Sequence, residues 1–175
     1  MLTPFPVILS PYDSSWPPQA AALRKQLTTL GPSLVKTHHI GSTSVPGLVA
    51  KPIIDLLAVV SHLKILDQNR SVVEALAYQW NGEYGIAGRR FCTLTNGEGK
   101  RLAHLHFFQA GSPQIDRHLA FRDYLRTHAP IALAYETEKR RARDLHPNDS
   151  NAYNLEKAAW VEGVLTMALD WYTRL

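Results

Sequence analysis

One segment largely determines how this chain folds: His39-Ile40-Gly41-Ser42-Thr43-Ser44-Val45-Pro46-Gly47-Leu48-Val49-Ala50-Lys51-Pro52-Ile53-Ile54-Asp55. It places a short loop rich in glycine and hydroxyl groups between two apolar runs, and the second run carries a carboxylate. Gly41 and Gly47 permit backbone conformations and close approaches that a side chain would prevent. Ser42, Thr43 and Ser44 offer hydroxyl and N–H groups to an anion. The loop is therefore predicted to bind phosphate, and it suits a triphosphate.

The carboxylate of Asp55 lies inside the run Ile53-Ile54-Asp55-Leu56-Leu57-Ala58-Val59-Val60, whose apolar and β-branched residues predict a buried strand. A buried carboxylate is costly without compensation, so we expect a cation or hydrogen-bond donors beside Asp55. Two interpretations are open. Asp55 binds a divalent metal ion next to the phosphates, or it only anchors the loop through N–H groups.

Further motifs accompany this segment along most of the chain. They are Pro11-Tyr12-Asp13 with Trp16-Pro17, Gly82-Glu83-Tyr84-Gly85-Ile86 with Gly88-Arg89-Arg90-Phe91, His104-Leu105-His106, Arg117-His118-Leu119 with Phe121-Arg122-Asp123-Tyr124-Leu125-Arg126, and Tyr153 with Lys157. With these motifs the chain resembles the GrpB (UPF0157) family, also known as a domain fused to some dephospho-coenzyme A kinases. The loop and Asp55 resemble the Gly-Ser loop and first metal carboxylate of the nucleotidyltransferase superfamily, which has a polymerase-β-like fold.

This resemblance implies an α/β (α+β) fold, with a mixed β-sheet flanked by helices and further helices at the C-terminal end. It also implies a nucleoside triphosphate at Gly41 and Ser42 and a divalent ion at Asp55. The chain departs from the superfamily pattern at Leu57, where a second metal carboxylate is expected. Two-metal phosphoryl transfer needs several carboxylates, and leucine cannot bind a metal ion. The ion site must therefore be reduced or built differently.

The neighbouring strand, expected over residues 102–108, carries His104 and His106 where the superfamily has its third acid. Residues two apart on a strand share a face, so the two imidazoles can converge on one ligand or ion. Imidazole favours zinc, whereas magnesium prefers oxygen ligands. Asp55, His104 and His106 are therefore the predicted catalytic and metal-binding residues. It stays open whether the histidines bind metal, act on phosphate without metal, or only line a polar strand face.

Three functions follow from this reading. The first is a nucleotidyltransferase that uses magnesium or manganese, with zinc as the less favoured ion. The second is a non-catalytic module of the same fold that binds a nucleotide or a coenzyme A-related ligand. The third and weaker alternative is a zinc hydrolase built on the histidines.

Several residues outside the loop are candidates for phosphate or base contacts. Arg89 and Arg90 follow a glycine at a strand start, where a guanidinium group can clamp phosphate, and we expect one of the two to face the ligand. Tyr153 and Lys157 lie one helical turn apart and share a face. Lys51 is included among the phosphate-binding candidates. The helical portion adds Arg117, Arg122 and Arg126 on one helix side and the cluster Lys139, Arg140, Arg141 and Arg143, which nearby acidic residues predict to be a solvated helix face.

Length and composition agree with a phosphate-binding domain. The 175 residues carry a net charge of +4 at pH 7, which favours phosphate-bearing small molecules without requiring a nucleic acid. We predict one domain over residues 1–175, with a helical portion from about 112 to 175. The single cysteine, Cys92, fits a reducing compartment and a core position. No targeting signal or membrane-spanning run is visible, so a cytoplasmic protein is expected; the oligomeric state is not predicted.

Local patterns predict the order of the elements. A first helix is capped by Asp13 or Ser14 and stopped by Gly31-Pro32, and a strand follows over 34–40. A helix is expected over 63–78, then strands over 89–95 and 101–109 joined by a hairpin turn at Asn96-Gly97. Helices are expected over 113–127 and from Pro130 to about 145, and Ser150 is expected to cap the last helix.

Overall fold

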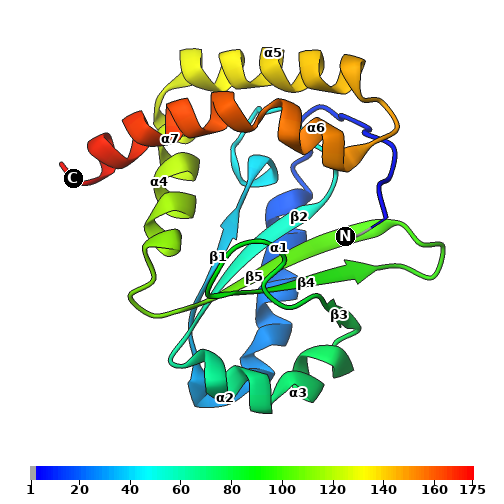
Figure 1. Cartoon of the computed structure of the whole chain (residues 1–175), viewed down its shortest axis with the longest axis vertical. Helices are drawn as coiled ribbons and strands as arrows, with labels where there is room; N and C mark the ends of the chain where they lie inside the picture. Colours follow the sequence, from blue (N-terminus) through cyan, green and yellow to red (C-terminus); the bar gives the residue numbers. More distant parts are fainter. Residues whose placement is uncertain (1–2) are drawn as a thin grey trace.

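A mixed five-stranded sheet forms the centre of the computed structural model, which describes residues 3–175 (Figure 1). The strands run in the order β1-β2-β5-β4-β3. Their bounds are β1 Leu34–Ile40, β2 Ile54–Val60, β3 Tyr78–Trp80, β4 Arg89–Thr95 and β5 Arg101–Gln109. Only the β2–β5 pair is parallel, and in its register Asp55 pairs with His104 and Leu57 with His106. The topology thus brings the two predicted strands of the site side by side.

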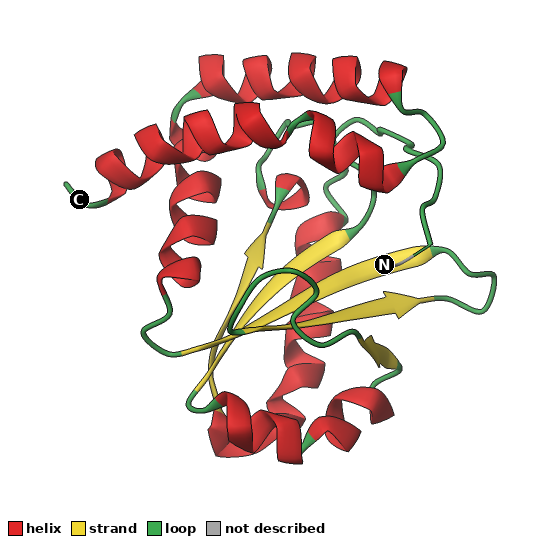
Figure 2. Ribbon diagram, in the orientation of Figure 1, coloured by secondary structure: helices red, strands yellow, loops and turns green. Residues whose placement is uncertain are grey.

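Helices cover both faces of the sheet (Figure 2). One face packs against the helices that precede β1 and follow β2: α1 Trp16–Gln26, the 3₁₀ segment Leu27–Ser33, α2 Leu63–Gln68 and α3 Arg70–Ala75. The C-terminal helices lie on the other side: α4 Pro113–Thr127, α5 Ala129–Leu145, α6 Ser150–Glu156 and α7 Ala158–Tyr172. The predicted class, a mixed sheet flanked by helices with further helices at the C-terminal end, is confirmed.

Burial on both faces explains why the β2 segment is almost continuously apolar. Leu56, Ala58 and Val60 point into the large core beneath α1. On the opposite face Leu57 packs with Leu119 of α4. Asp55 stands on this same face, because side chains alternate along a strand. The polar site therefore begins where α4 stops covering the sheet.

The helix predicted over 63–78 was too long. The segment forms two short helices separated at Asn69, and the second ends at Ala75. Ala77 adopts a positive φ of 65°, which turns the chain into β3. Tyr78 then pairs with Leu94 and is buried in the core, so strand pairing and burial outweighed the helical spacing of the apolar residues.

The predicted caps and turns also needed correction. Asp149, rather than Ser150, caps α6 through hydrogen bonds from two backbone N–H groups, and the last predicted helix is broken at Lys157 into α6 and α7. The first helix begins after Ser15. The predicted β4–β5 hairpin is present, and Gly99 in its connection has a positive φ of 81°. Two residues of the domain predicted over 1–175, 1 and 2, lie outside the described residues. Within residues 3–175, no helix has the length and apolar character needed to cross a membrane.

Candidate functional site

The backbone of Gly41 lies directly against the carboxylate of Asp55. Gly41 follows β1 with φ 70° and ψ −175°, a conformation that other residues rarely adopt. A Cβ atom at this position would lie 2.9 Å from both Cβ and Cγ of Asp55 and closer still to Oδ2. Glycine is therefore required here by backbone conformation and by space, and the loop is held against the acid.

The hydroxyl groups of the loop have different roles. Ser44 Oγ donates a hydrogen bond of 2.6 Å to the Gly41 carbonyl, and Thr43 Oγ1 lies 2.9 Å from His39 Nε2. These two side chains fasten the single 3₁₀ turn Ser42–Ser44. Ser42 Oγ instead lies 3.5 Å from Lys139 Nζ. Of the three predicted phosphate-binding hydroxyls, Ser42 is thus the one left facing a cation, while Ser44 lies outside the cavity described below.

Both predicted histidines lie beside Asp55. His104 Nδ1 lies 3.0 Å from Asp55 Oδ1, and His106 Nε2 lies 3.9 Å from the same oxygen. Burial by itself raises the pKa of Asp55, but the hydrogen bond with His104 and the proximity of His106 outweigh burial and hold the pKa well below its usual value. Burial lowers the pKa of His106. The structure therefore places a charged carboxylate beside two imidazole rings.

Arg89 is the guanidinium group that reaches this cluster. It is 6% exposed, and it donates hydrogen bonds to the carbonyls of Glu83 and Tyr84. Its NH1 group also lies 3.4 Å from His106 Nδ1. Arg89 thus ties the 82–88 loop to the histidine cluster, with most of its donors already used by the protein.

Arg90 does not line the cavity, so of the two arginines Arg89 is the one that can face a ligand. Alternation along β4 points Arg90 to the opposite face of the sheet from Arg89. There it forms a two-pronged salt bridge with Asp67 of α2, with N···O distances of 2.7 and 2.8 Å. The Asp67 partner could not be recognised from local sequence, because it lies 23 residues away.

Three lysines converge on the same space. The ammonium groups of Lys51 and Lys157 lie 5.0 and 5.1 Å from the ring centroid of Tyr153. Lys139 is 2% exposed and donates to the Val49 carbonyl. Burial lowers the pKa of Lys51 and Lys157 to about 8 and that of Lys139 to about 7. Such shifts mean that the charges are held in a poorly solvated place without enough negative partners.

Lys139 is the main residue that sequence reasoning misplaced. It belongs to the cluster predicted to form a solvated face of α5, yet it points inward. The other three members of that cluster, Arg140, Arg141 and Arg143, do pair with acidic residues at the surface. The sequence signal for this orientation is the spacing: Lys139 follows Tyr135 by four residues, so both lie on the same side of the helix, and Tyr135 is also buried.

The arginines of α4 do not complete the site. Arg117 forms a salt bridge with Glu162, while Arg122 and Arg126 donate to the carbonyls of His39 and Ser44. These last two bonds fasten the helix to His39, just before the loop, and to Ser44 within it. Their role in this structure is to position the loop.

His118 of α4 is a further residue that sequence reasoning did not select. Its ring centroid lies 5.3 Å from that of His106 and 5.7 Å from that of Phe108. Burial, followed by the charge of His106, lowers the pKa of His118 to about 3, so the ring is neutral. It packs behind the cluster as an apolar support.

A cavity of about 600 Å³ joins these groups, within the size range of small-molecule sites. Among the described residues that line it, Asp55 is the only acid. Besides Gly41, its polar lining consists of Ser42, Thr43, Lys51, Asp55, Tyr84, Arg89, His104, His106, Tyr135, Lys139, Tyr153, Asn154 and Lys157. The sheet, the loop and the C-terminal helices all contribute, so the cavity is cationic apart from one carboxylate.

The cavity side chains fit a metal ion poorly. No group of three or more His, Cys, Asp or Glu residues in the described chain is arranged to hold one. Leu57 is fully buried in an apolar cluster, and the nearest donors to Asp55 are imidazoles rather than the oxygen ligands that magnesium requires. His106 accepts from Arg89 at Nδ1, so in its neutral form the nitrogen facing Asp55 carries the proton and has no lone pair for zinc.

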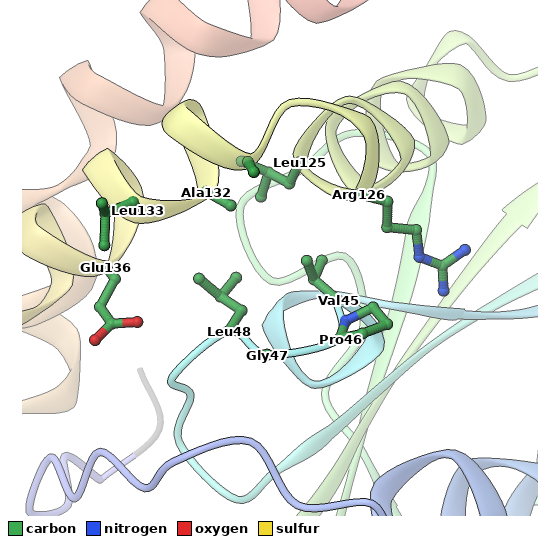
Figure 3. A pocket seen from close by; sticks show the side chains of 10 residues that line it. Val45, Pro46, Gly47, Leu48, Leu125, Arg126, Ala132, Leu133 and Glu136 are labelled. Carbon is green, nitrogen blue, oxygen red and sulfur yellow. The ribbon is translucent and has the colours of Figure 1, made fainter.

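A second cavity, of about 530 Å³, lies beyond the other end of the loop (Figure 3). The loop residues there are Val45, Pro46, Gly47 and Leu48. They face Leu125 of α4 and Leu133 of α5. The loop thus presents Gly41 to Thr43 to the polar cavity and its second half to a mostly apolar one, in which Arg126 and Glu136 are the charged residues. Gly47 belongs to this second part and lies away from the predicted phosphate site.

Comparisons with known proteins agree with this architecture. A family model described as "GrpB protein" matches residues 6–167. UPF0157 protein YqkA of Bacillus subtilis is 42% identical over 141 residues, which cover 81% of this chain but 40% of that relative's length. The chain thus spans less than half of that relative.

Solved structures share the fold. The crystal structure of conserved protein GrpB from Enterococcus faecalis superposes with a TM-score of 0.87 at 37% identity, covering 94% of this chain and 99% of that one. Cid1, solved in complex with its short product ApU, superposes with a TM-score of 0.53 at 18% identity, covering 76% of this chain and 42% of that one. The second similarity is one of fold alone, and it confirms the predicted nucleotidyltransferase-like architecture.

Proposed function

The chain belongs to the GrpB family, and on that premise we propose that it binds a nucleoside triphosphate in the cavity beside Gly41 and Ser42. In this proposal the phosphate groups lie against Lys51, Lys139 and Lys157. Nucleotidyl transfer is the class of reaction that the fold favours.

The convergence of the three lysines carries the proposal. Each ammonium group is held in a cavity lined by a single acid, and each has a lowered pKa because burial disfavours its charge. A polyanion would supply the missing negative charge and favour the protonated lysines. Ser42 Oγ, beside Lys139, adds a neutral hydrogen-bond donor for a phosphate oxygen.

A nucleotide is preferred among phosphate-bearing ligands for two reasons. The sheet and loop share their fold with Cid1, a protein solved with the product ApU. The cavity also places aromatic and apolar side chains, including Tyr84, Phe91 and Phe121, around its charged groups. Such side chains can pack against a base.

A divalent ion at Asp55 stays a prediction and has no part in this proposal. The donor set is one carboxylate with imidazole neighbours, which does not match what magnesium or manganese requires. The zinc hydrolase also stays a prediction, and the protonated nitrogen of His106 that faces Asp55 speaks against it.

A leucine at position 57, in place of a second metal carboxylate, favours a second candidate function: ligand binding without turnover. Its side chain is fully buried against Leu119 and Phe108, so the position cannot supply a metal ligand. A protein that binds a nucleotide or a coenzyme A-related ligand without turnover would need the lysines but no reactive group.

Isothermal titration calorimetry with ATP, UTP, ADP and adenosine tests the proposal. We expect triphosphates to bind more tightly than ADP and adenosine not to bind, because the lysines recognise phosphate. Lys139→Met should weaken ATP binding at least tenfold, whereas Lys64→Met, at an exposed position on α2, should leave it unchanged. Absence of binding by both triphosphates, or equal binding by the two variants, would overturn it.

A further inference from the structure

A chain of polar contacts runs through Arg89, His106, Asp55 and His104. Both ends of this chain line the cavity, but only Arg89 is fastened to the 82–88 loop. We propose that this chain fixes His104 with its proton on Nδ1, so that Nε2 accepts a proton from the hydroxyl group that attacks the bound nucleotide. The inference rests on the proposed function, and it gives Asp55 an orienting role in place of a metal-binding one.

Arg89 sets the first orientation. A guanidinium group has only donors, so His106 Nδ1, 3.4 Å from Arg89 NH1, must present its lone pair there. In the neutral ring the proton then lies on Nε2, the nitrogen that faces Asp55 Oδ1 at 3.9 Å. His106 therefore presents a proton to the carboxylate.

Asp55 determines which nitrogen of His104 carries the proton. The carboxylate is ionised and can only accept hydrogen bonds. His104 Nδ1, 3.0 Å from Asp55 Oδ1, must therefore carry the proton that joins them. The lone pair of a neutral His104 is left on Nε2, and no hydrogen bond within residues 3–175 engages that nitrogen.

The surroundings keep Asp55 in this position. On one side the Gly41 backbone leaves no room even for a methyl group beside Oδ2. Phe91 packs against both histidines, with ring centroids 5.4 Å from His104 and 5.1 Å from His106. A carboxylate confined in this way holds the His104 ring in one tautomer and one orientation, which is the arrangement that a general base requires.

The proposed step balances without an additional reactant. The proton of the acceptor hydroxyl moves to His104 Nε2 while its oxygen forms a bond to the α-phosphorus. The bond between the α-phosphorus and the oxygen that bridges to the β-phosphorus breaks, and pyrophosphate leaves with that electron pair. Lys51, Lys139 and Lys157 lie in the same cavity and would neutralise the leaving group. His104 then returns its proton to solvent.

Long-range ¹H–¹⁵N NMR of the histidine rings tests the tautomer in the free protein, with no nucleotide present. His104 is expected to show a protonated Nδ1 and an unprotonated Nε2, and Asp55→Asn should abolish this preference. His62, exposed beside α2, serves as the reference ring. A His104 proton on Nε2, or selective broadening of the His104 and His106 signals by stoichiometric Mn²⁺, would overturn the inference. The wild-type spectrum alone shows which nitrogen of His104 carries the proton, so the test holds even if Asp55→Asn fails to fold.

Carbethoxylation by diethylpyrocarbonate, located by mass spectrometry, tests whether Nε2 faces the bound nucleotide. We expect His104 to react, and ATP to slow its reaction at least tenfold without protecting His62. ATP that binds in calorimetry but leaves His104 unprotected would overturn this inference alone. The predicted tautomer together with binding of neither ATP nor UTP would overturn the proposed function instead.

Discussion

Leu57 lies opposite His106 in the parallel pairing of β2 and β5, two residues beyond the Asp55–His104 pair and on the same face of the sheet. At this position β2 becomes apolar, while His106 on β5 still lines the polar cavity. Leu57 is fully buried with Ile40, Phe108 and Leu119, so α4 covers the position where a second acid would stand. The departure from the nucleotidyltransferase pattern is thus built into the packing as well as into the sequence.

Restoring an acid at this position should disrupt the protein. We expect Leu57→Asp to lower the free energy of unfolding by at least about 2 kcal/mol more than Leu57→Ala does, because it places an uncompensated charge in an apolar cluster. Leu57→Ala removes only packing and should cost about 2–5 kcal/mol. Urea denaturation of both variants measures the difference. A Leu57→Asp protein as stable as Leu57→Ala would mean that the carboxylate reaches the cavity.

The two glycines of the loop offer a matched pair of substitutions. Gly41→Ala should cost about 1–2 kcal/mol for the left-handed backbone, and overlap with Asp55 should add about 1–3 kcal/mol. Gly47 has a similar φ of 78° but no atom within 4 Å of an added Cβ. Gly47→Ala should therefore cost only the backbone contribution and no overlap. Thermal and urea unfolding compare them. Equal costs would show that Asp55 moves aside freely.

Much of the fold was predictable because it depends on local patterns. The segments predicted as strands over 34–40, 89–95 and 101–109 coincide with β1, β4 and β5, since turn residues bound each segment. The helix predicted over 63–78 failed where tertiary pairing decided the outcome. Tyr78 gains a strand partner and burial that no helical spacing reveals.

The candidate site was predictable only in part, for the same physical reason. The loop, Asp55 and the two histidines follow from strand periodicity and register. Lys139 does not, because a lysine among acidic neighbours normally lies in solvent, and its inward direction depends on how α5 crosses the loop. Nothing local distinguished Arg89 from Arg90 either, since only the arrangement of the sheet decides which of them faces the cavity.

The two adjacent arginines should respond differently to substitution by glutamine. Arg89 is buried, and it joins the 82–88 loop to His106, so Arg89→Gln should cost about 2–4 kcal/mol through lost charged hydrogen bonds. Arg90→Gln breaks a partly exposed pair with Asp67 and should cost less than about 1 kcal/mol. Urea denaturation provides both values, and a larger effect at Arg90 would contradict the assignment of the two faces.

Proton uptake on ligand binding follows from the lowered pKa of Lys139. With a pKa of about 7, this lysine is mostly neutral at pH 8 in the free protein and mostly charged at pH 6. Bound phosphate favours the charged form, so it raises the pKa of Lys139, and the complex takes up a proton at pH 8. At pH 6 little uptake by Lys139 remains, because the proton is already present.

The affinity for ATP should therefore decrease as the pH rises from 7 to 9, with Lys51 and Lys157 contributing above pH 8. Calorimetry at pH 8 in buffers of different ionisation enthalpy counts the protons directly. Lys139→Met should reduce the uptake, and Lys64→Met should not.

The lowered pKa of Lys139 affects the stability of the free protein in the opposite direction from its affinity for ATP. Between pH 7 and 10.5 the unfolded state binds more protons than the folded state, so the contribution of Lys139 to the free energy of unfolding rises with pH through that range. An ATP affinity that rises with pH between 7 and 9 would contradict the placement of phosphate against these lysines.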